Sequence, residues 1–257
     1  MYLEELFGLG GKVAIVTGGG QGIGQVVAVG LAKAGAEVVI TCRHGADETV
    51  RLIEEAGGKG YYVQCDVTSE ESVDKALAEI MEKSGRIDVL FNNAGICYHK
   101  GTFEASIDDW KEVIDTNLTG EYIMARAVGK IMIDKGIAGS IINMASMSGT
   151  IVNIPQWQAA YNASKAGVIH LSKSLAIEWA QTGVRVNSIS PGYVATPMSI
   201  DPNFVEPELM AAWMPLMPMG RMAKPEELIP AILYLASPAA GYTTGSDIIV
   251  DGGYSVQ

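Results

Sequence analysis

The sequence is poor in cysteine, which occurs three times in 257 residues. Cys42, Cys65 and Cys97 are an odd number without metal-ligand spacing, so they argue against a disulfide framework and against a zinc site. No other cluster of His, Cys, Asp and Glu has ligand spacing, and the sequence therefore implies no metal. We expect free thiols in a reducing compartment.

Positive charge is also scarce, because 18 Lys and Arg residues stand against 29 Asp and Glu residues. The resulting net charge of −11 argues against nucleic acid or an anionic membrane as the main partner. No run of about 18 uncharged apolar residues occurs, and no charged-then-apolar leader precedes residue 12. We expect a soluble, cytoplasmic protein with neither a membrane nor a nucleic-acid partner.

Apolar, β-branched runs recur along the chain with helical stretches between them. Residues 22–34 and 70–83 carry Ala, Leu, Glu and Lys at helical spacing, and each is long enough for a crossover helix. This alternation predicts a single α/β domain over 1–257, a Rossmann-like doubly wound parallel sheet of about seven strands flanked by helices. The predicted strands are 12–17, 37–42, 60–64, 87–92, 139–145, 184–190 and 246–250.

Residues 197–222 depart from this alternation, because they contain five prolines and six methionines. Prolines at this density break long helices. Unbranched thioethers can repack around different shapes. The segment is either an irregular surface connection with two short helices or a mobile lid over a substrate pocket.

A glycine-rich turn follows the first predicted strand, with Gly18, Gly22 and Gly24 in the spacing T-G-x-x-x-G-x-G. This spacing differs from the commoner dinucleotide fingerprint G-x-G-x-x-G. Glycines let the backbone approach phosphates, and the N-terminus of the following helix supplies free N–H groups. The turn predicts a cradle for the phosphates of a nucleotide.

The end of the second predicted strand indicates which nucleotide binds. An acidic side chain there would hold both ribose hydroxyls of NAD, but the stretch Thr41-Cys42-Arg43-His44 has no carboxylate. Arg43 can instead pair with a 2′-phosphate, which favours NADP(H) over NAD(H). The alternative is that Arg43 stacks on adenine or faces water.

Tyr161 and Lys165 are four residues apart, a spacing that places both side chains on one face of a helix. A phenol ordinarily ionises near about pH 10. A neighbouring ammonium favours the phenolate, so that the phenol can exchange a proton closer to neutral pH. With the glycine-rich turn in the same chain, the pair indicates proton transfer beside a nucleotide.

Short motifs occur in a fixed order along the chain: Thr17-Gly18 with Gly22-Ile23-Gly24, Asp66-Val67, Asn92-Asn93-Ala94-Gly95, Asn117, Ser146, Tyr161 with Lys165, Pro191-Gly192 and Asp251-Gly252-Gly253. In these motifs and their spacing, residues 8–254 resemble the short-chain dehydrogenase/reductase family. The resemblance implies an NAD(P)-dependent enzyme that acts on CH–OH groups, with subunits assembled as a homotetramer.

The resemblance also implies which residues would hold the cofactor. The turn with Gly18, Gln21, Gly22, Ile23 and Gly24 would hold the phosphates. Asp66 and the backbone of Val67 would contact adenine, while Asn93 would lie along the adenine ribose and hold the central strands together. Pro191, the backbone of Val194 and the hydroxyl of Thr196 would hold the nicotinamide carboxamide.

Four residues would be catalytic by the same resemblance. Tyr161 would donate a proton in carbonyl reduction and accept one in alcohol oxidation. Lys165 would lower the pKa of Tyr161 and bond the nicotinamide ribose. Ser146 would hydrogen-bond the substrate oxygen, and Asn117 would fix a water that relays protons through Lys165.

Two serines compete for the catalytic position. The family pattern places this serine three residues before a glycine, which selects Ser146 because Gly149 follows it. The distance in sequence from Ser146 to Tyr161 is two residues longer than in many members, and a short insertion within 151–156 could absorb it. Ser148 stays open as the alternative or as a second substrate contact.

The stretches 146–156 and 191–198 resemble sugar-alcohol dehydrogenases and ketose reductases. A polyol needs many hydrogen-bond partners, and Asn153, Gln156 and Gln158 supply amides that both donate and accept. We therefore expect a polyol or ketose substrate that contacts Ser146, Ser148, Asn153, Gln158 and Tyr161. The alternative is that these amides stabilise the loop itself.

Three other functions stay open. A sugar-acid dehydrogenase of the gluconate type would use Lys100 or His99 as a carboxylate partner, although both can be solvated loop residues. A 3-oxoacyl-carrier-protein reductase would have to dock an acidic carrier protein, which the negative net charge disfavours. A non-catalytic nucleotide-binding protein would not need Asn117, Ser146, Tyr161 and Lys165 together.

Overall fold

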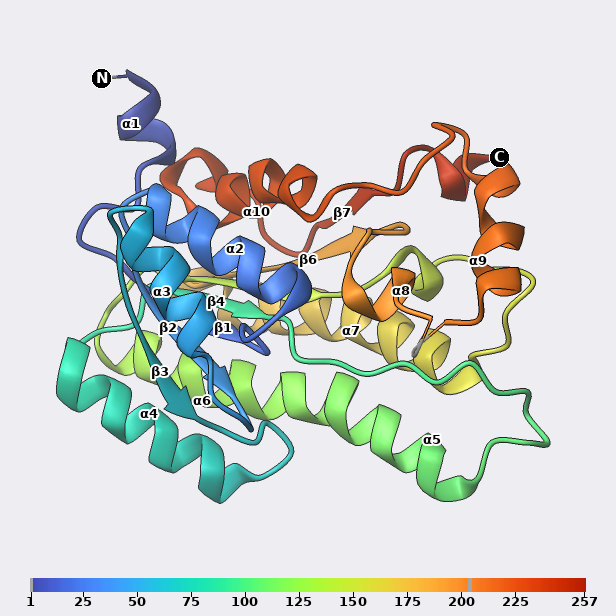
Figure 1. The fold of residues 1–257 in the computed structure, drawn as a ribbon. Coiled ribbons are helices and arrows are strands. Elements are labelled where there is room, and N and C mark those ends of the chain that lie inside the picture. The colour runs from blue at the N-terminus through green and yellow to red at the C-terminus, as the bar shows by residue number, and fades with distance from the viewer. Residues whose placement is uncertain (1, 203–204) are drawn as a thin grey trace.

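Seven parallel strands form one sheet in a computed structural model that describes residues 2–202 and 205–257. The strand order is β3-β2-β1-β4-β5-β6-β7, so the direction of winding reverses between β1 and β4 (Figure 1). The strands are β1 (Val13–Thr17), β2 (Glu37–Cys42), β3 (Lys59–Gln64), β4 (Val89–Asn92), β5 (Ser140–Met144), β6 (Arg185–Pro191) and β7 (Asp247–Val250). The predicted fold class is confirmed, and each strand lies within two residues of its predicted bounds.

Successive side chains of the central strands enter two different cores. Ile15 and Leu90 belong to one buried cluster, while Val16 and Phe91 belong to the other. Both faces of these strands are covered, and for that reason their sequences are continuous apolar runs rather than alternating ones. The register pairs Ile15 of β1 with Leu90 of β4, which aligns the carboxyl ends of the two strands.

Helices cover both faces of the sheet (Figure 1). The face that Val16 enters is covered by α2 (Gly22–Lys33), α3 (Asp47–Glu55) and α10 (Ile229–Ala236). The opposite face is covered by α4 (Glu70–Ser84), α6 (Gly120–Asp134) and α7 (Ala159–Trp179). The remaining α-helices are α1 (Tyr2–Phe7), α5 (Ile107–Ile114), α8 (Pro197–Ile200) and α9 (Pro207–Trp213).

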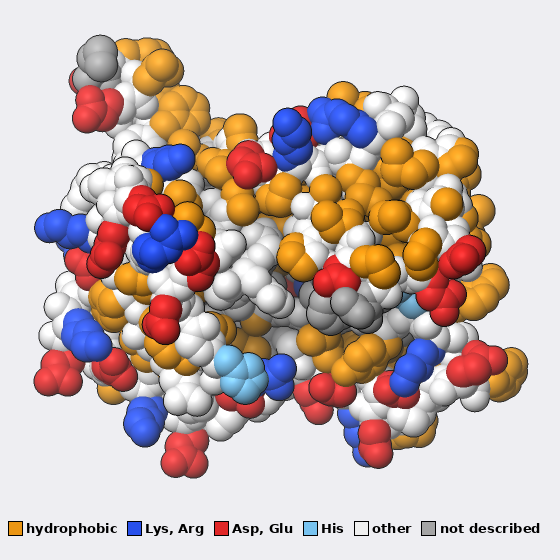
Figure 2. Space-filling model, in the orientation of Figure 1, with side chains coloured by type: hydrophobic (Ala, Val, Ile, Leu, Met, Phe, Trp, Pro, Cys, Tyr) orange, Lys and Arg blue, Asp and Glu red, His pale blue; other side chains and the backbone are white. Residues whose placement is uncertain are grey.

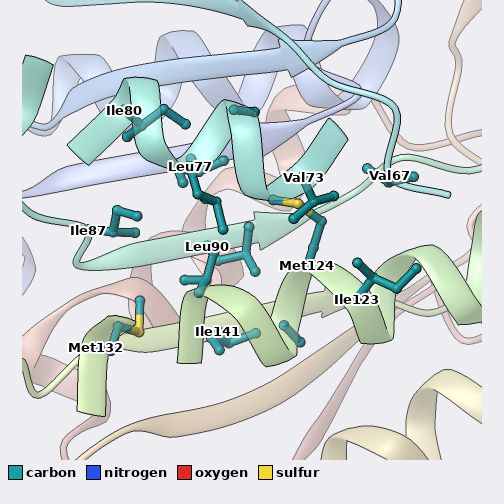
Figure 3. Packing of buried hydrophobic residues seen from close by; sticks show 14 of the residues in the cluster. Val67, Val73, Leu77, Ile80, Ile87, Leu90, Ile123, Met124, Met132 and Ile141 are labelled. Atoms are coloured by element: carbon teal, nitrogen blue, oxygen red, sulfur yellow. The ribbon is translucent and has the colours of Figure 1, made fainter. Parts of the chain in front are cut away.

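The core between α4, α6 and the sheet fixes the position of α6. Figure 3 shows Leu77 of α4, Leu90 of β4 and Met124 of α6 in the core between these helices and the sheet. All three side chains are buried, and burying each contributes about 1.5–3 kcal/mol. A π-helical segment, Asp115–Thr119, runs directly into α6, so that the same core also holds this segment in place.

The ends of α4 follow local sequence signals. Ser69 precedes the helix, and its side chain accepts a hydrogen bond from the backbone N–H of Ser72. Gly85 ends the helix with a φ of 74°, a left-handed conformation that favours glycine. The observed helix, Glu70–Ser84, extends the predicted one by one residue.

The segment 197–222 contains α8, α9 and a 3₁₀ turn at Met214–Leu216. It packs through a separate small cluster in which Val205, Trp213 and Met217 contact Met147 and Tyr254. Residues 203 and 204 of the predicted lid lie outside the described residues. Apolar side chains gather over this part of the surface, and the surface is hollowed between it and the side that carries α2 and α3 (Figure 2). Its role as a lid stays a prediction.

Across residues 2–202 and 205–257, we find no helix that combines the length and apolar character needed to cross a membrane.

Candidate active site

The carboxyl ends of β1, β4, β5 and β6 bring the predicted site residues to one edge of the sheet. In open α/β sheets ligands bind at this edge, where the strand order reverses. Here the reversal lies between β1 and β4. The glycine-rich turn follows β1, Asn93 follows β4, Ser146 follows β5, and Val194 follows β6.

The turn after β1 is shaped for a close approach of an anion. Gly18 and Gly22 have φ values of 63° and 57°, which residues other than glycine rarely adopt. A Cβ added at Gly24 would lie 2.5 Å from the carbonyl oxygen of Gly18. Gln21 precedes α2 without capping it by its side chain, so that the first N–H groups of the helix are left for a ligand. This arrangement fits the phosphates of a dinucleotide.

Thr17 and Asn93 join the turn to the end of β4. The Thr17 Oγ1 accepts hydrogen bonds from the backbone N–H groups of Asn93 (2.8 Å) and Ala94 (2.9 Å). The Asn93 Nδ2 donates to the carbonyl oxygens of Thr17 (2.9 Å) and Gly18 (3.4 Å). The side chain of Asn93 therefore holds the ends of β1 and β4 together beside the glycine-rich turn.

Arg43, Asp66 and Val67 lie at the ends of β2 and β3. Arg43 is exposed, and within the described residues its guanidinium has no carboxylate within ion-pair distance. Asp66 Oδ1 accepts hydrogen bonds from the Thr68 hydroxyl (2.7 Å) and backbone N–H (3.0 Å). The Thr68 hydroxyl and the positive charge of Arg43 lower the pKa of Asp66. Val67 is buried beside it.

The residues after β6 close the other end of the hollow. Pro191 is the last residue of β6, and Val194 forms a backbone bridge with Ala223. Thr196 is buried, and its side chain would be the nearest neighbour, at 3.9 Å, of a Cβ added to Gly22. Thr196 therefore lies beside the glycine-rich turn, as a residue that contacts a bound dinucleotide should.

Tyr161, Lys165, Ser146 and Asn117 converge between α7, β5 and the π-helical segment. The Ser146 side chain is close enough to the Tyr161 hydroxyl to lower its pKa, and the Lys165 Nζ lies 5.9 Å from the centre of the Tyr161 ring. Asn117 Oδ1 accepts from the Ile96 N–H, and Asn117 Nδ2 donates to the Ile96 carbonyl oxygen, both at 2.8 Å. The structure thus brings together the four residues that the sequence analysis singled out as catalytic.

Lys165 is buried and has two partners that the sequence analysis did not foresee. Its Nζ donates to the Glu121 Oε1 at 3.1 Å and to the carbonyl oxygen of Met144. The exposed fractions of the Lys165 and Glu121 side chains are 3% and 1%. The Oε2 of Glu121 is buried and has no hydrogen-bond partner among the described residues.

Burial governs the titration of these groups. It raises the pKa of Tyr161 above its ordinary value, with the nearby Cys97 and Glu121 adding to the shift and the Ser146 side chain opposing it. Burial also raises the pKa of Glu121 to about 8, against the attraction of Lys165, and that of Cys97 to about 12. The net shift of Tyr161 is opposite to the expected lowering, because its hydroxyl is buried and Glu121 faces the ammonium.

The loop after β5 turns its polar residues inward. The Ser148 hydroxyl donates to the Asn153 Oδ1 at 2.6 Å, and the Gln158 Nε2 donates to Ser148 Oγ at 3.2 Å. Val152 and Trp157, in contrast, are 68% and 65% exposed. Ser148 is therefore engaged with the amides of the loop, while Ser146 is the serine that reaches Tyr161.

Gln156 connects this loop to the segment 197–222. Its Oε1 accepts from the Trp213 Nε1 at 2.9 Å, and its Nε2 donates to the Tyr193 hydroxyl at 2.8 Å. The rings of Tyr193 and Trp213 stack with their centres 4.7 Å apart, and His99 meets the Trp213 ring edge-on. These contacts place α9 against the wall of the site.

Lys100 and His99, considered as substrate ligands, differ in their surroundings. The Lys100 Nζ lies 2.8 Å from the Asp109 Oδ1, so its charge already has a partner. Burial lowers the pKa of His99 and keeps it neutral near pH 7. Neither group offers an unpaired positive charge to a carboxylate substrate.

Glu121 was not among the predicted site residues, although the sequence carries a signal for it. Buried residues of α6 recur at Met124, Ala125, Val128 and Met132, and Glu121 continues the same helical stripe toward the N-terminus. A carboxylate on the buried stripe of a helix must have a partner or a function. Trp213 gave no comparable signal, because a lone aromatic residue among prolines does not reveal what it contacts.

Within the described part of the chain, no group of three or more His, Cys, Asp and Glu residues could hold a metal ion.

Comparison with known proteins agrees with this geometry. A family model described as enoyl-(acyl carrier protein) reductase matches residues 18–255. A sorbose reductase of Candida albicans is 47% identical over 256 residues, which cover 98% of this chain and 89% of that protein. An NADP-dependent mannitol dehydrogenase of Alternaria alternata is 44% identical over 261 residues, covering 99% and 96% of the two chains.

Among solved structures, a short-chain type dehydrogenase/reductase from Mycobacterium marinum superposes with a TM-score of 0.94 at 43% identity, and the match covers 98% of this chain and 99% of that one. The similarity thus extends over nearly the whole length of each relative. This chain belongs to the short-chain dehydrogenase/reductase family, within the branch that holds the sorbose reductase and the mannitol dehydrogenase.

Proposed function

We propose that this protein is an oxidoreductase that transfers a hydride between NADP(H) and a sugar alcohol or its ketose. The observation that carries the proposal is the convergence of Tyr161, Ser146 and Lys165 at the sheet edge beside the glycine-rich turn. The cofactor, when bound, supplies the hydride chemistry at its nicotinamide ring. The chain itself has to orient the reacting carbon and move one proton.

The proton is handled by Tyr161. In reduction its hydroxyl donates a proton to the substrate oxygen, and in oxidation its phenolate accepts one. Ser146 donates a hydrogen bond to the same oxygen as negative charge develops on it. The proximity of Ser146 to the Tyr161 hydroxyl supports this assignment over Ser148, whose hydroxyl is used by Asn153 and Gln158.

Lys165 and Asn117 support Tyr161. The Lys165 ammonium binds the nicotinamide ribose and favours the phenolate. The side chain of Asn117 fixes Ile96 and donates to the Ser164 hydroxyl at 3.2 Å, so that it ties the loop after β4 to α7. A water held at this junction connects Lys165 with bulk solvent.

The preference for NADP(H) over NAD(H) rests on Arg43. Its exposed guanidinium has no ion-pair partner in the described structure, stands at the end of β2 and is free to pair with a 2′-phosphate. The mannitol dehydrogenase relative is NADP-dependent. Asp66, Val67, Asn93 and Thr196 complete the cofactor contacts.

A polyol or ketose fits the polar lining of the loop after β5. Asn153 and Gln158 are buried with Ser148 next to Ser146, and their amides can exchange hydrogen bonds within the loop for bonds to hydroxyl groups. The relatives include a sorbose reductase and a mannitol dehydrogenase. The segment 197–222 serves as the lid, because α9 already contacts Gln156 through Trp213.

The enzyme works as a cytoplasmic homotetramer in this proposal. Tyr122 of α6 and Ile177 of α7 are 44% and 80% exposed, which leaves apolar surface on two long helices that a partner subunit could cover.

A spectrophotometric panel of ketoses and polyols with both cofactors tests the function. We expect reduction of at least one ketose with NADPH, and a kcat/KM at least about tenfold higher with NADPH than with NADH. A tenfold preference for NADH would refute the cofactor assignment. Turnover of sugar acids or acyl thioesters, with none of ketoses or polyols, would refute the substrate class.

A further inference from the structure

Glu121 and Lys165 form a buried pair of opposite charges directly behind the catalytic tyrosine. The Glu121 Oε1 lies 3.1 Å from the Lys165 Nζ, and neither side chain is more than 3% exposed. Two buried charges remain together only where their attraction and hydrogen bonds offset the loss of water. In this pair the loss of water is offset incompletely, because the Glu121 Oε2 has no hydrogen-bond partner among the described residues.

The position of Glu121 is fixed from two sides. Its backbone carbonyl oxygen accepts a hydrogen bond from the Asn92 Nδ2 at 2.7 Å, at the end of β4. Its helix is held by the core formed with α4, which includes Met124 one turn further along (Figure 3). The carboxylate therefore cannot withdraw to solvent, and the Lys165 ammonium is held where Glu121 and the Met144 carbonyl oxygen meet.

We infer that Glu121 is a positioning residue for the reaction: its carboxylate anchors the Lys165 ammonium and sets the pH at which Tyr161 gives up its proton. The inference rests on the proposed function, since it assigns a role beside Tyr161. Glu121 does not touch the substrate and acts through Lys165.

The direction of this control follows from counting charges. Above its pKa of about 8, Glu121 is ionised. With Lys165 protonated and Tyr161 neutral, the site then has no net charge, and loss of one more proton leaves a buried net charge of −1. With a neutral residue at position 121, loss of the first proton takes the site from +1 to zero. A negative Glu121 therefore delays formation of the reactive phenolate to higher pH.

Other charged groups near the pair are few. Cys97, from the loop after β4, faces both Lys165 and Tyr161, and burial keeps it as a neutral thiol. From β4 and β5 the neighbours are the neutral amides of Asn92 and Asn143. The charged groups of α4 and the π-helical segment stay at the surface: Glu70 bonds Arg126 there, and Asp115 is exposed. Among the described residues, Glu121 and Lys165 are thus the buried ion pair beside Tyr161.

The substitution Glu121→Gln tests the inference, because it keeps the shape of the side chain and removes its charge. The measurement is the pH dependence of kcat for alcohol oxidation at saturating oxidised cofactor. We expect the acidic limb of the profile to move to lower pH by about one to two units. This is the shift expected when one charge is removed at short range in a medium of intermediate dielectric. A limb that stays at the wild-type pH would overturn the inference.

Two further variants separate positioning from a general structural effect. Glu121→Asp keeps the charge but shortens the reach to Lys165. We therefore expect the acidic limb at the same pH as in the wild type, and a plateau value of kcat that is about tenfold lower. A wild-type plateau in this variant would refute anchoring, even if Glu121→Gln does not fold. Asp88→Asn alters another buried carboxylate, at the opposite end of β4, and must leave the limb unmoved. An equal shift in Asp88→Asn would also overturn the inference.

Ultraviolet difference absorbance of the phenolate provides a readout that needs no turnover. Each protein, saturated with oxidised cofactor, is titrated against its own Tyr161→Phe counterpart. A lower apparent pKa of Tyr161 in Glu121→Gln supports the inference even if no polyol or ketose is a substrate, in which case only the proposed function fails. If the apparent pKa of Tyr161 is the same in Glu121→Gln as in the wild type, and the enzyme does oxidise polyols, the role of Glu121 is refuted while the proposed function stands.

Discussion

Two buried carboxylates stand at opposite ends of the same sheet, and their surroundings differ. Asp88, just before β4, accepts hydrogen bonds from the Val13 N–H at 3.0 Å and from two nitrogens of Arg86 at 2.8 and 2.6 Å. Glu121, beyond the carboxyl end of β4, accepts one bond from Lys165 and has an unpartnered Oε2 within the described structure. A carboxylate with all its partners suits a structural role, whereas an incompletely satisfied one persists where it has a function.

The same contrast extends to the neighbouring residues. At the amino end of the sheet, polar groups are bonded to backbone or to surface cations. At the carboxyl end, Tyr161, Lys165 and Glu121 are held in a site where burial raises the pKa of two of them. Substitutions at the amino end should therefore change stability, and substitutions at the carboxyl end should change catalysis.

The largest effect is expected at the carboxyl end, from Tyr161→Phe. Removing the hydroxyl would eliminate the group that we propose moves the proton, and we expect kcat to fall about 10³- to 10⁴-fold. Cofactor affinity, measured by quenching of tryptophan fluorescence, should stay close to wild type because the ring remains. A variant that kept more than a tenth of the wild-type kcat would show that another group transfers the proton.

At the amino end, Asp88→Asn should lower the free energy of unfolding by about 1–3 kcal/mol, because an amide nitrogen would face the donors of Val13 and Arg86. Denaturant titration followed by fluorescence measures this loss. The kcat and KM of the folded protein should match wild type. A change in kcat without a change in the free energy of unfolding would contradict the structural role that we assign to Asp88.

A smaller difference should separate the two serines after β5. Ser146→Ala removes a donor to the developing oxyanion and should lower kcat about 10²-fold. Ser148→Ala removes a bond within the loop and should change KM more than kcat. Parallel kinetics on the two variants decide between them, and a larger loss of kcat in Ser148→Ala would move the catalytic role to Ser148.

Much of the fold could be predicted from the sequence. Continuous apolar runs identify strands buried on both faces, and all seven were located closely. Residues 70–83 were predicted as a helix from helical spacing, and the structure shows that Ser69 and Gly85 cap this helix. The glycine-rich turn and the Tyr161–Lys165 spacing were both visible in the sequence, and together they indicated proton transfer beside a nucleotide.

The surroundings of the site were not predictable in the same way. The separate roles of Ser146 and Ser148 depend on how the loop after β5 folds, because that fold bonds Ser148 to Asn153 and Gln158. The direction of the Tyr161 pKa shift also depends on burial and on Glu121, neither of which a spacing of four residues reveals.

The sequence by itself determined the order of strands and helices, the phosphate turn and the residues that face one another within a single helix, because these depend on interactions between near neighbours in the chain. Only the tertiary structure decided that Lys165 pairs with Glu121, 44 residues away, and that Trp213 bonds Gln156, 57 residues away. Periodicity reports which face a side chain occupies. The partner it meets on that face is set by how separate elements pack against the sheet.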